Sequence, residues 1–205
     1  MSEDLTTVLS SKTQTVEIGR DRATVIIGER INPTGRKNVL AALQEGDFDI
    51  VRQDAVSQVA AGAAVLDVNA GVPGADEPVL LKQVMQVVME TTDVPLCIDT
   101  ADPDALAAAL AVYGGKALVN SVNGEERSLA AVLPLVKEHD AAVIALCMDD
   151  DGIPETPEAR LKVAAKIIER AGKLGIPPQN VVIDPLALTI QTDRCTCERP
   201  CISIV

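Results

Sequence analysis

The sequence has almost no aromatic residues: among its 205 residues there are one Phe, one Tyr and no Trp. Proteins that bind single-stranded nucleic acid stack the bases on aromatic side chains, which this chain hardly offers. A phosphate backbone would also be repelled by its formal net charge of −12. We therefore predict that nucleic acid is not a partner. The hydrophobic fraction of 47% is ordinary for a globular protein, so aliphatic side chains must build the core.

Long apolar runs and targeting signals are missing as well. No apolar run approaches the roughly 20 residues that a membrane-spanning helix needs. The first 14 residues lack the basic and then apolar pattern of a signal peptide. We therefore expect a cytoplasmic protein that does not bind a membrane.

Histidine is nearly absent, since His139 is the only one. This excludes His-rich zinc sites and argues against a Ser-His-Asp triad. Cys97 and Cys147 lie in apolar runs and are expected to be small buried core residues. The other cysteines crowd the C-terminal tail, at Cys195, Cys197 and Cys201. Because that cluster has no fourth ligand, we interpret it as tail composition and predict no bound metal in this chain.

Six short apolar runs alternate with longer segments of helical periodicity. The runs span residues 24–32, 64–71, 94–100, 116–123, 141–149 and 180–185. Each run is almost continuously apolar, which is typical of parallel strands buried on both faces. Helix signals lie between the runs; one example is Thr156 as a cap, Pro157 at the first helical position and Gly175 as a stop. The pattern predicts an α/β fold, either an open doubly wound sheet or a (β/α)8 barrel.

Polar residues stand at the end of almost every run, which favours the barrel because its strand ends converge on one mouth. They are Glu29, Asn32, Asp67, Asn69, Asp99, Asn120, Asn123, Asp149 and Asp184. Any one of them taken alone is more often a helix cap than a ligand contact. Repetition at six strand ends favours a site for a small polar ligand that forms hydrogen bonds. The competing interpretation is a Mg²⁺ site formed by Asp67, Asp99 and Asp184.

Six motifs resemble, in order, those of the pterin-binding barrel family. They read IIGERINPTG, VLDVNAG, PLCIDT, LVNSVNGE, LCMDDDGIP and VVIDPL. The resemblance covers roughly residues 20 to 190 and is strongest to the methyltetrahydrofolate:corrinoid methyltransferases, which are related to the folate-binding module of cobalamin-dependent methionine synthase. It implies a TIM-type (β/α)8 barrel that is incomplete, with about six of the eight βα units present.

Dihydropteroate synthase, another branch of that family, has Arg after the second strand and Lys after the sixth. In this sequence residues 69–74 and 185–187 contain neither Arg nor Lys. A pterin that carries a diphosphate would lack its charge partners there. The resemblance therefore favours a methyltransferase, and a dihydropteroate synthase-like enzyme is kept as the alternative.

The resemblance also implies roles for individual residues. Asp99, Asn120 and Asp184 would hydrogen-bond the pterin ring, and Asp99 and Asp184 are our candidate catalytic residues. The remaining candidates for the substrate-binding mouth are Glu29, Asn32, Asp67 and Asn69. The implied reaction moves the N5 methyl group of methyltetrahydrofolate to the Co(I) of a corrinoid (cobalamin) on a partner protein, or the reverse. Because N5 is a poor leaving group, it must gain a proton or a strong hydrogen bond as the bond breaks. Full-length members are expected to be homodimers.

We divide the chain into an N-terminal extension at 1–22, a partial pterin-binding barrel at 23–192 and an irregular Cys-containing tail at 193–205. Residues 13–21 could form a short strand that covers the bottom of the barrel, and the sequence leaves this open. The tail has no helical period, as after a frameshift or a premature end. We therefore expect the last two strands, and with them an Asn-bearing loop near N5, to be missing. On this expectation methyl transfer by this chain alone is in doubt, and the further alternative is a non-catalytic pterin-binding or interaction subunit.

Overall fold

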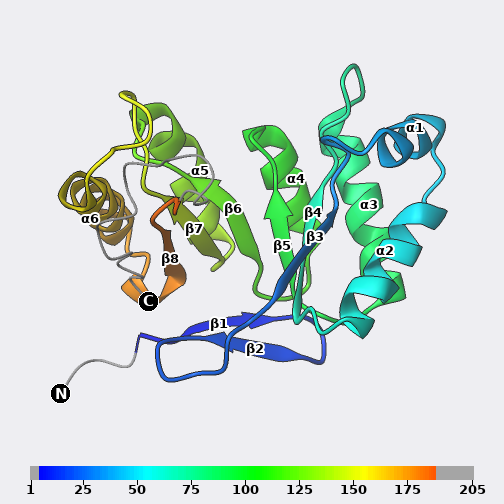
Figure 1. Cartoon of the computed structure of the whole chain (residues 1–205), viewed down its shortest axis with the longest axis horizontal. Helices are drawn as coiled ribbons and strands as arrows, with labels where there is room; N and C mark the ends of the chain where they lie inside the picture. Colours follow the sequence, from blue (N-terminus) through cyan, green and yellow to red (C-terminus); the bar gives the residue numbers. More distant parts are fainter. Residues whose placement is uncertain (1–4, 188–205) are drawn as a thin grey trace.

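Six parallel strands form one curved sheet in the computed structural model, which describes residues 5–187 (Figure 1). The strands are β3 (Ile27–Ile31), β4 (Val65–Asn69), β5 (Leu96–Asp99), β6 (Leu118–Val122), β7 (Ala142–Leu146) and β8 (Val181–Asp184). Each strand lies inside one of the six apolar runs of the sequence, so all six strand predictions are confirmed.

The helices connect successive strands and cover the outer face of the sheet (Figure 1). They are α1 (Lys37–Glu45), α2 (Asp49–Ala60), α3 (Glu77–Thr91), α4 (Pro103–Val112), α5 (Glu126–Glu138), α6 (Pro157–Lys173) and the 3₁₀ helix η1 (Pro178–Asn180). The predicted cap at Thr156 is confirmed, because its side chain accepts from the Ala159 N–H at 3.2 Å. Asp102 caps α4 in a similar way and accepts from the Asp104 N–H at 2.9 Å. Gly175 follows α6 with a φ of 75°, as a helix stop requires.

The strands pair in the order of the chain, from β3 to β8. A doubly wound sheet would reverse its strand order at a switch point, and this sheet does not. The architecture is therefore the wall of a TIM-type barrel, with six of its strands and the five helical connections between them. Within residues 5–187, β3 and β8 are the two edges, and no strand pairs with their outer sides.

The sheet has a separate hydrophobic cluster on each face. Its outer face packs against the helices through side chains such as Leu66, Ile98 and Val143. Its inner face buries Val65, Cys97, Leu118 and Ala142. Because strand side chains alternate between the faces, each inner residue predicts another two positions further along the strand. From Val65, Cys97 and Leu118 these positions are Asp67, Asp99 and Asn120.

A β-hairpin closes the bottom of the barrel, formed by β1 (Thr7–Ser10) and β2 (Thr15–Ile18) (Figure 1). Leu9 is fully buried and completes the inner-face cluster from below. The Ser10 N–H donates to the Lys116 carbonyl at 3.1 Å. The structure thus settles the position of residues 15–18, which the sequence left open.

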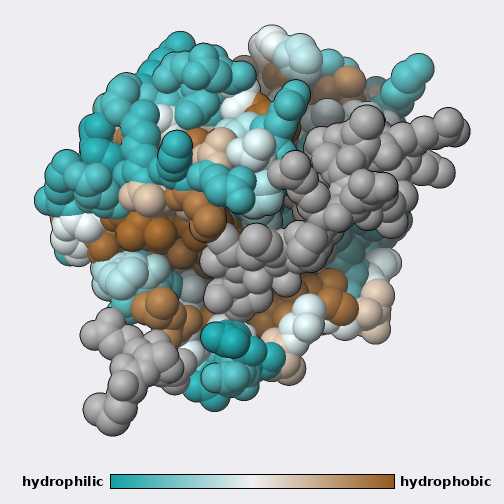
Figure 2. Space-filling model, turned by 60° about the vertical axis from the view of Figure 1, so that its left-hand side comes forward, coloured by the Kyte–Doolittle hydropathy of each residue, from teal (hydrophilic) through white to brown (hydrophobic). Residues whose placement is uncertain are grey.

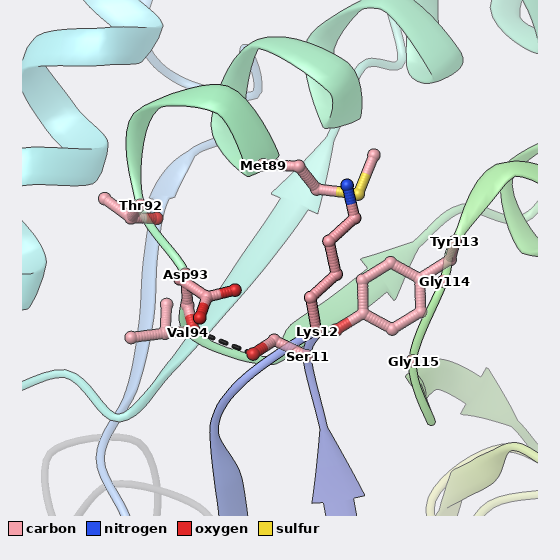
Figure 3. A pocket seen from close by; sticks show the side chains of 9 residues that line it. All are labelled: Ser11, Lys12, Met89, Thr92, Asp93, Val94, Tyr113, Gly114 and Gly115. Atoms are coloured by element: carbon pink, nitrogen blue, oxygen red, sulfur yellow. Dashed lines mark hydrogen bonds between the residues drawn. The ribbon is translucent and has the colours of Figure 1, made fainter.

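Tyr113 holds the hairpin to the barrel. Its hydroxyl donates to the Ser10 carbonyl at 2.9 Å and accepts from the Leu96 N–H at 3.0 Å, and burial raises the pKa of Tyr113 to about 12. Nearby, Gly115 passes so close that a Cβ there would lie 2.0 Å from the Ser10 carbonyl oxygen. A pocket beside this contact is lined by residues that include Lys12, Met89 and Tyr113 (Figure 3). Its volume of about 20 Å³ has room for about one water molecule, so we do not assign it a substrate.

The side of the molecule on which α6 and β8 lie exposes apolar surface. Figure 2 shows this side from the front, with hydrophobic surface (brown) exposed between hydrophilic regions (teal). Helix α6 contributes two exposed aliphatic side chains, Leu161 and Ile168. No helix within residues 5–187 is long and apolar enough to cross a membrane.

Both cysteines of the apolar runs, Cys97 and Cys147, are buried free thiols, as predicted. The tail at 193–205, with Cys195, Cys197 and Cys201, lies outside the described residues.

Candidate functional site

Polar side chains of three adjacent strands meet on the inner face at the carboxyl end of the sheet. Asp67 and Asn69 come from β4, Asp99 from β5 and Asn120 from β6. The parallel register places Asn69 beside Asp99, and Asp99 beside Asn120. The structure thus brings together four of the predicted site residues, because their strands are neighbours and each projects to the same face.

Each carboxylate of this cluster accepts a hydrogen bond from an amide. Asn120 donates through Nδ2 to Asp67 Oδ2 at 3.1 Å, and Asn69 donates through Nδ2 to Asp99 Oδ2 at 3.0 Å. The Asn69 oxygen accepts from the Gly71 N–H at 2.8 Å. Within residues 5–187, no protein donor is found for the Asn120 oxygen or for the second oxygen of Asp99. These two oxygens are therefore available to accept from a ligand.

Burial raises the pKa of both carboxyl groups. The pKa of Asp67 rises to about 6, chiefly because the group is buried; the hydrogen bond from Asn120 opposes the rise, and the nearby negative charges of Asp99 and Glu29 add to it. The pKa of Asp99 is raised by burial and by Glu77 and Glu29, against the hydrogen bond from Asn69. Within residues 5–187 no Lys or Arg forms an ion pair with either carboxylate. A ligand that brings N–H groups would relieve this uncompensated negative charge.

Two other predicted residues, Glu29 and Asn32, form no hydrogen bond with the four clustered residues in the part of the chain that the structure describes. Glu29 in β3 is exposed but close enough to raise the pKa of Asp67 and Asp99. Asn32 uses its side-chain oxygen within its own loop, where it accepts from the Thr34 N–H at 2.8 Å.

Asp184 ends β8 and lies beside β7. Its Oδ1 accepts from the Leu186 N–H at 2.8 Å, and its charge raises the pKa of the buried Cys147 thiol, after burial itself. The described residues show no hydrogen bond between Asp184 and the four clustered residues. Val182, two residues before Asp184, packs against the inner-face cluster, so Asp184 projects from the same face of the sheet as the four residues but from a strand at its edge.

Two residues of the site were missed by sequence reasoning. Cys97, expected only to fill the core, is directly paired with Asp67 in the sheet, and its thiol lowers the pKa of that carboxyl group. Glu77 accepts from the Thr100 hydroxyl and raises the pKa of Asp99. In the sequence Glu77 looks like an ordinary acidic residue of a first helical turn, so no local signal distinguishes it.

No group of three or more His, Cys, Asp or Glu side chains within residues 5–187 is arranged to hold a metal ion. The arrangement therefore gives no support to the competing Mg²⁺ interpretation. The loop after β7 and the first turns of α6 line a separate open pocket of about 330 Å³, to which none of the four clustered residues contributes. Lys166 lines this pocket and donates to the Gly124 carbonyl at 2.6 Å, which connects α6 with the loop after β6.

Comparisons with known proteins match most of the chain. The model of the pterin binding enzyme family matches residues 28–196. Methylcorrinoid:tetrahydrofolate methyltransferase of Eubacterium limosum is 35% identical over 175 residues, which cover 83% of this chain and 63% of that protein. Methionine synthase of Mycobacterium tuberculosis is 30% identical over 192 residues, which cover 91% of this chain and 16% of that protein. The chain thus spans less than two thirds of the length of either relative.

Solved structures share the fold. Dihydropteroate synthase of Xanthomonas albilineans with 4-aminobenzoic acid superimposes with a TM-score of 0.63 at 23% identity, over 88% of this chain and 66% of that one. Dihydropteroate synthase of Thermus thermophilus gives a TM-score of 0.59 at 25% identity, over 87% of this chain and 64% of that one. These similarities show that the six-stranded sheet has the TIM-barrel architecture of the dihydropteroate synthase structures.

Proposed function

Since the chain belongs to the pterin-binding enzyme family, we propose that it binds methyltetrahydrofolate and transfers the N5 methyl group to a corrinoid protein, or catalyses the reverse reaction. The proposed site is the carboxyl end of β4, β5 and β6, together with Asp184 at the end of β8. The partner would be a protein that carries the corrinoid.

The observation that carries the proposal is the pairing of buried carboxylates with amides. A pterin ring presents N–H donors along its aminopyrimidine edge, and the cluster presents acceptors: the second oxygen of Asp99 and the Asn120 oxygen. The hydrogen bond to Asp99 would have an ionised acceptor, and the bond to Asn120 a neutral amide oxygen. Both would form at partly buried groups, where hydrogen bonds are stronger than in bulk water. Asp184 is proposed to accept from the same edge, on the resemblance of its Ile-Asp-Pro motif to the family.

Methyl transfer is preferred to dihydropteroate synthesis for two reasons. The curated relatives at 30–35% identity are methylcorrinoid:tetrahydrofolate methyltransferase and methionine synthase, whereas the dihydropteroate synthase structures at 19–26% identity argue mainly for the fold. The loop after β4, residues 70–76, also contains no Lys or Arg that could neutralise a diphosphate.

In the proposed mechanism the protein supplies orientation and hydrogen bonds. Asp99 and Asn120 would fix the ring at the barrel mouth, and the surrounding polar groups would stabilise the charge that develops at N5 as its bond to the methyl carbon breaks. No side chain of the chain forms a covalent bond to the methyl group. The corrinoid, when its protein is bound, supplies the cobalt that accepts or donates the methyl group.

Calorimetric titration with tetrahydrofolate tests the binding step. We expect the wild-type chain to bind and Asp99→Asn to bind roughly 10- to 150-fold more weakly, the size expected for one lost charge-assisted hydrogen bond. Asp140→Asn is the matched control, because its side chain is 83% exposed and lies at the opposite end of the barrel. Absence of binding by the wild-type chain would refute the proposal.

A methyl-transfer assay with reduced cobalamin then separates the enzyme from a non-catalytic subunit. Transfer that Asp99→Asn slows supports the methyltransferase. Binding without transfer, also in the presence of a corrinoid protein, would favour the alternative of a pterin-binding subunit.

A further inference from the structure

Asp67 differs from the other site carboxylates in its burial. Its residue is only 5% exposed, whereas Asp99 is half-buried and Glu29 is exposed. Asp67 lies two residues before Asn69, which ends β4. Both side chains project from the same face, so Asn69 lies between Asp67 and the mouth. A ligand at the mouth would meet Asn69 and Asp99 before it reached Asp67.

The contacts of Asp67 come from inside the protein. Asn120 donates to its Oδ2 at 3.1 Å from β6, and the Cys97 thiol lies at the directly paired position of β5. Below it, Val65 and Leu118 begin the hydrophobic layer of the inner face. The surroundings of Asp67 are therefore protein side chains, and its polar contact toward the mouth is Asn120.

This contact decides which end of the Asn120 amide faces a ligand. An Asn side chain can present either its oxygen or its NH₂ group after a 180° turn. An ionised carboxylate only accepts, so Asp67 can pair with the NH₂ end alone. The Asn120 oxygen is then directed away from Asp67, and no protein donor within residues 5–187 occupies it.

We propose that Asp67 is a positioning residue, which holds the Asn120 amide with its oxygen toward the mouth and thereby selects ligands that offer an N–H group there. The inference rests on the proposed pterin site and changes the predicted role of Asp67 from a direct contact to an indirect one. Asp67 does not touch the ligand, and its contribution to binding passes through Asn120.

A double-mutant cycle tests this route, with tetrahydrofolate binding measured for the wild-type chain, Asp67→Ala, Asn120→Ala and the double variant. Each single substitution is expected to weaken binding about 10-fold. The double variant should be no more than about 2-fold weaker than Asn120→Ala, because Asp67 has nothing left to position. Losses that multiply to about 100-fold would overturn the inference, since Asp67 would then act independently of Asn120.

An exchange of the two side chains provides a readout that a merely structural role would not give. Asp67→Asn allows two amides to pair in either orientation and should weaken binding several-fold. Asp67→Asn combined with Asn120→Asp restores a fixed donor at the deep position and an acceptor at the mouth, so binding should return to within about 3-fold of wild type. If urea denaturation shows that the combined variant is folded, and this variant binds tetrahydrofolate more weakly than Asp67→Asn does, the inference is wrong.

The two proposals fail in different ways. If the wild-type chain does not bind tetrahydrofolate, the proposed function is refuted and the inference with it. If the wild-type chain binds but the cycle gives independent losses, only the role of Asp67 is refuted. Asp140→Asn again serves as the control, and the cycle remains decisive if the exchanged variant does not fold.

Discussion

Replacing Asp67 by Asn should make the protein more stable at neutral pH, because the buried carboxylate carries a cost that an amide does not. Burial raises the pKa of Asp67 from 3.8 to about 6 in the folded state. Ionisation is therefore harder in the folded than in the unfolded chain. Stability from this group is fully present below pH 3.8 and is lost as the pH rises through about 6.

The size of the effect follows from the shift. At about 1.4 kcal/mol per pKa unit, ionisation of Asp67 costs roughly 3 kcal/mol of unfolding free energy above pH 7. Most of this cost appears between about pH 4 and pH 7, since the unfolded group ionises near the lower value and the folded group near pH 6. For a domain with a total stability of about 5–15 kcal/mol, a change of this size is easily measured.

Urea denaturation of wild type and Asp67→Asn at several values between pH 4 and pH 8 is the assay. The difference in unfolding free energy between the two proteins should grow in favour of the variant by about 2 kcal/mol across this range. Asp140→Asn, which changes an exposed carboxylate, measures the background. A difference for Asp67→Asn that varies with pH no more than the background would refute the reasoning.

Further predictions concern the hairpin and one helix cap, and urea denaturation measures each. Gly115→Ala should cost roughly 3 kcal/mol, because its Cβ would lie 2.0 Å from the Ser10 carbonyl oxygen, and limited proteolysis should then cleave the hairpin sooner; unchanged stability and cleavage would contradict the tight contact. Tyr113→Phe should cost about 1–3 kcal/mol, because the Leu96 N–H and the Ser10 carbonyl lose their shared partner; a loss below 0.5 kcal/mol, a threshold of about half the usual net worth of one hydrogen bond, would argue against it. Thr156→Ala should cost about 1 kcal/mol by removing a helix cap, and Thr156→Ser should restore most of it.

The cost that Asp67 imposes on stability agrees with its proposed role. A buried carboxylate is retained at a strand position where an aliphatic side chain would pack without penalty. If Asp67 orients Asn120 for a ligand, the same substitution should raise stability and lower affinity. This opposite change in the two properties is common at binding sites, where function and stability place different demands on one residue.

The six strands and the connecting helices could be predicted from the sequence because their signals are local. Continuous apolar runs marked strands buried on both faces, and caps such as Asp102 and Thr156 marked helix starts through bonds to nearby backbone N–H groups. The family was also recognisable, since six motifs in order are preserved at the strand ends. Local signals likewise predicted that Asp67, Asn69, Asp99 and Asn120 gather at one mouth, because parallel strands end on the same side.

Only the tertiary structure determined which of those residues is buried and which hydrogen bonds each one forms. Which carboxylate is buried depends on neighbouring strands, so the raised pKa of Asp67 and its hydrogen bond from Asn120 cannot be inferred from the residues around it in the chain. The hairpin contact was equally hidden, because Tyr113 and Ser10 are about 100 residues apart and meet only when the barrel forms. Desolvation and long-range hydrogen bonds arise from folded neighbours, and sequence patterns record mainly neighbours within a turn or a strand.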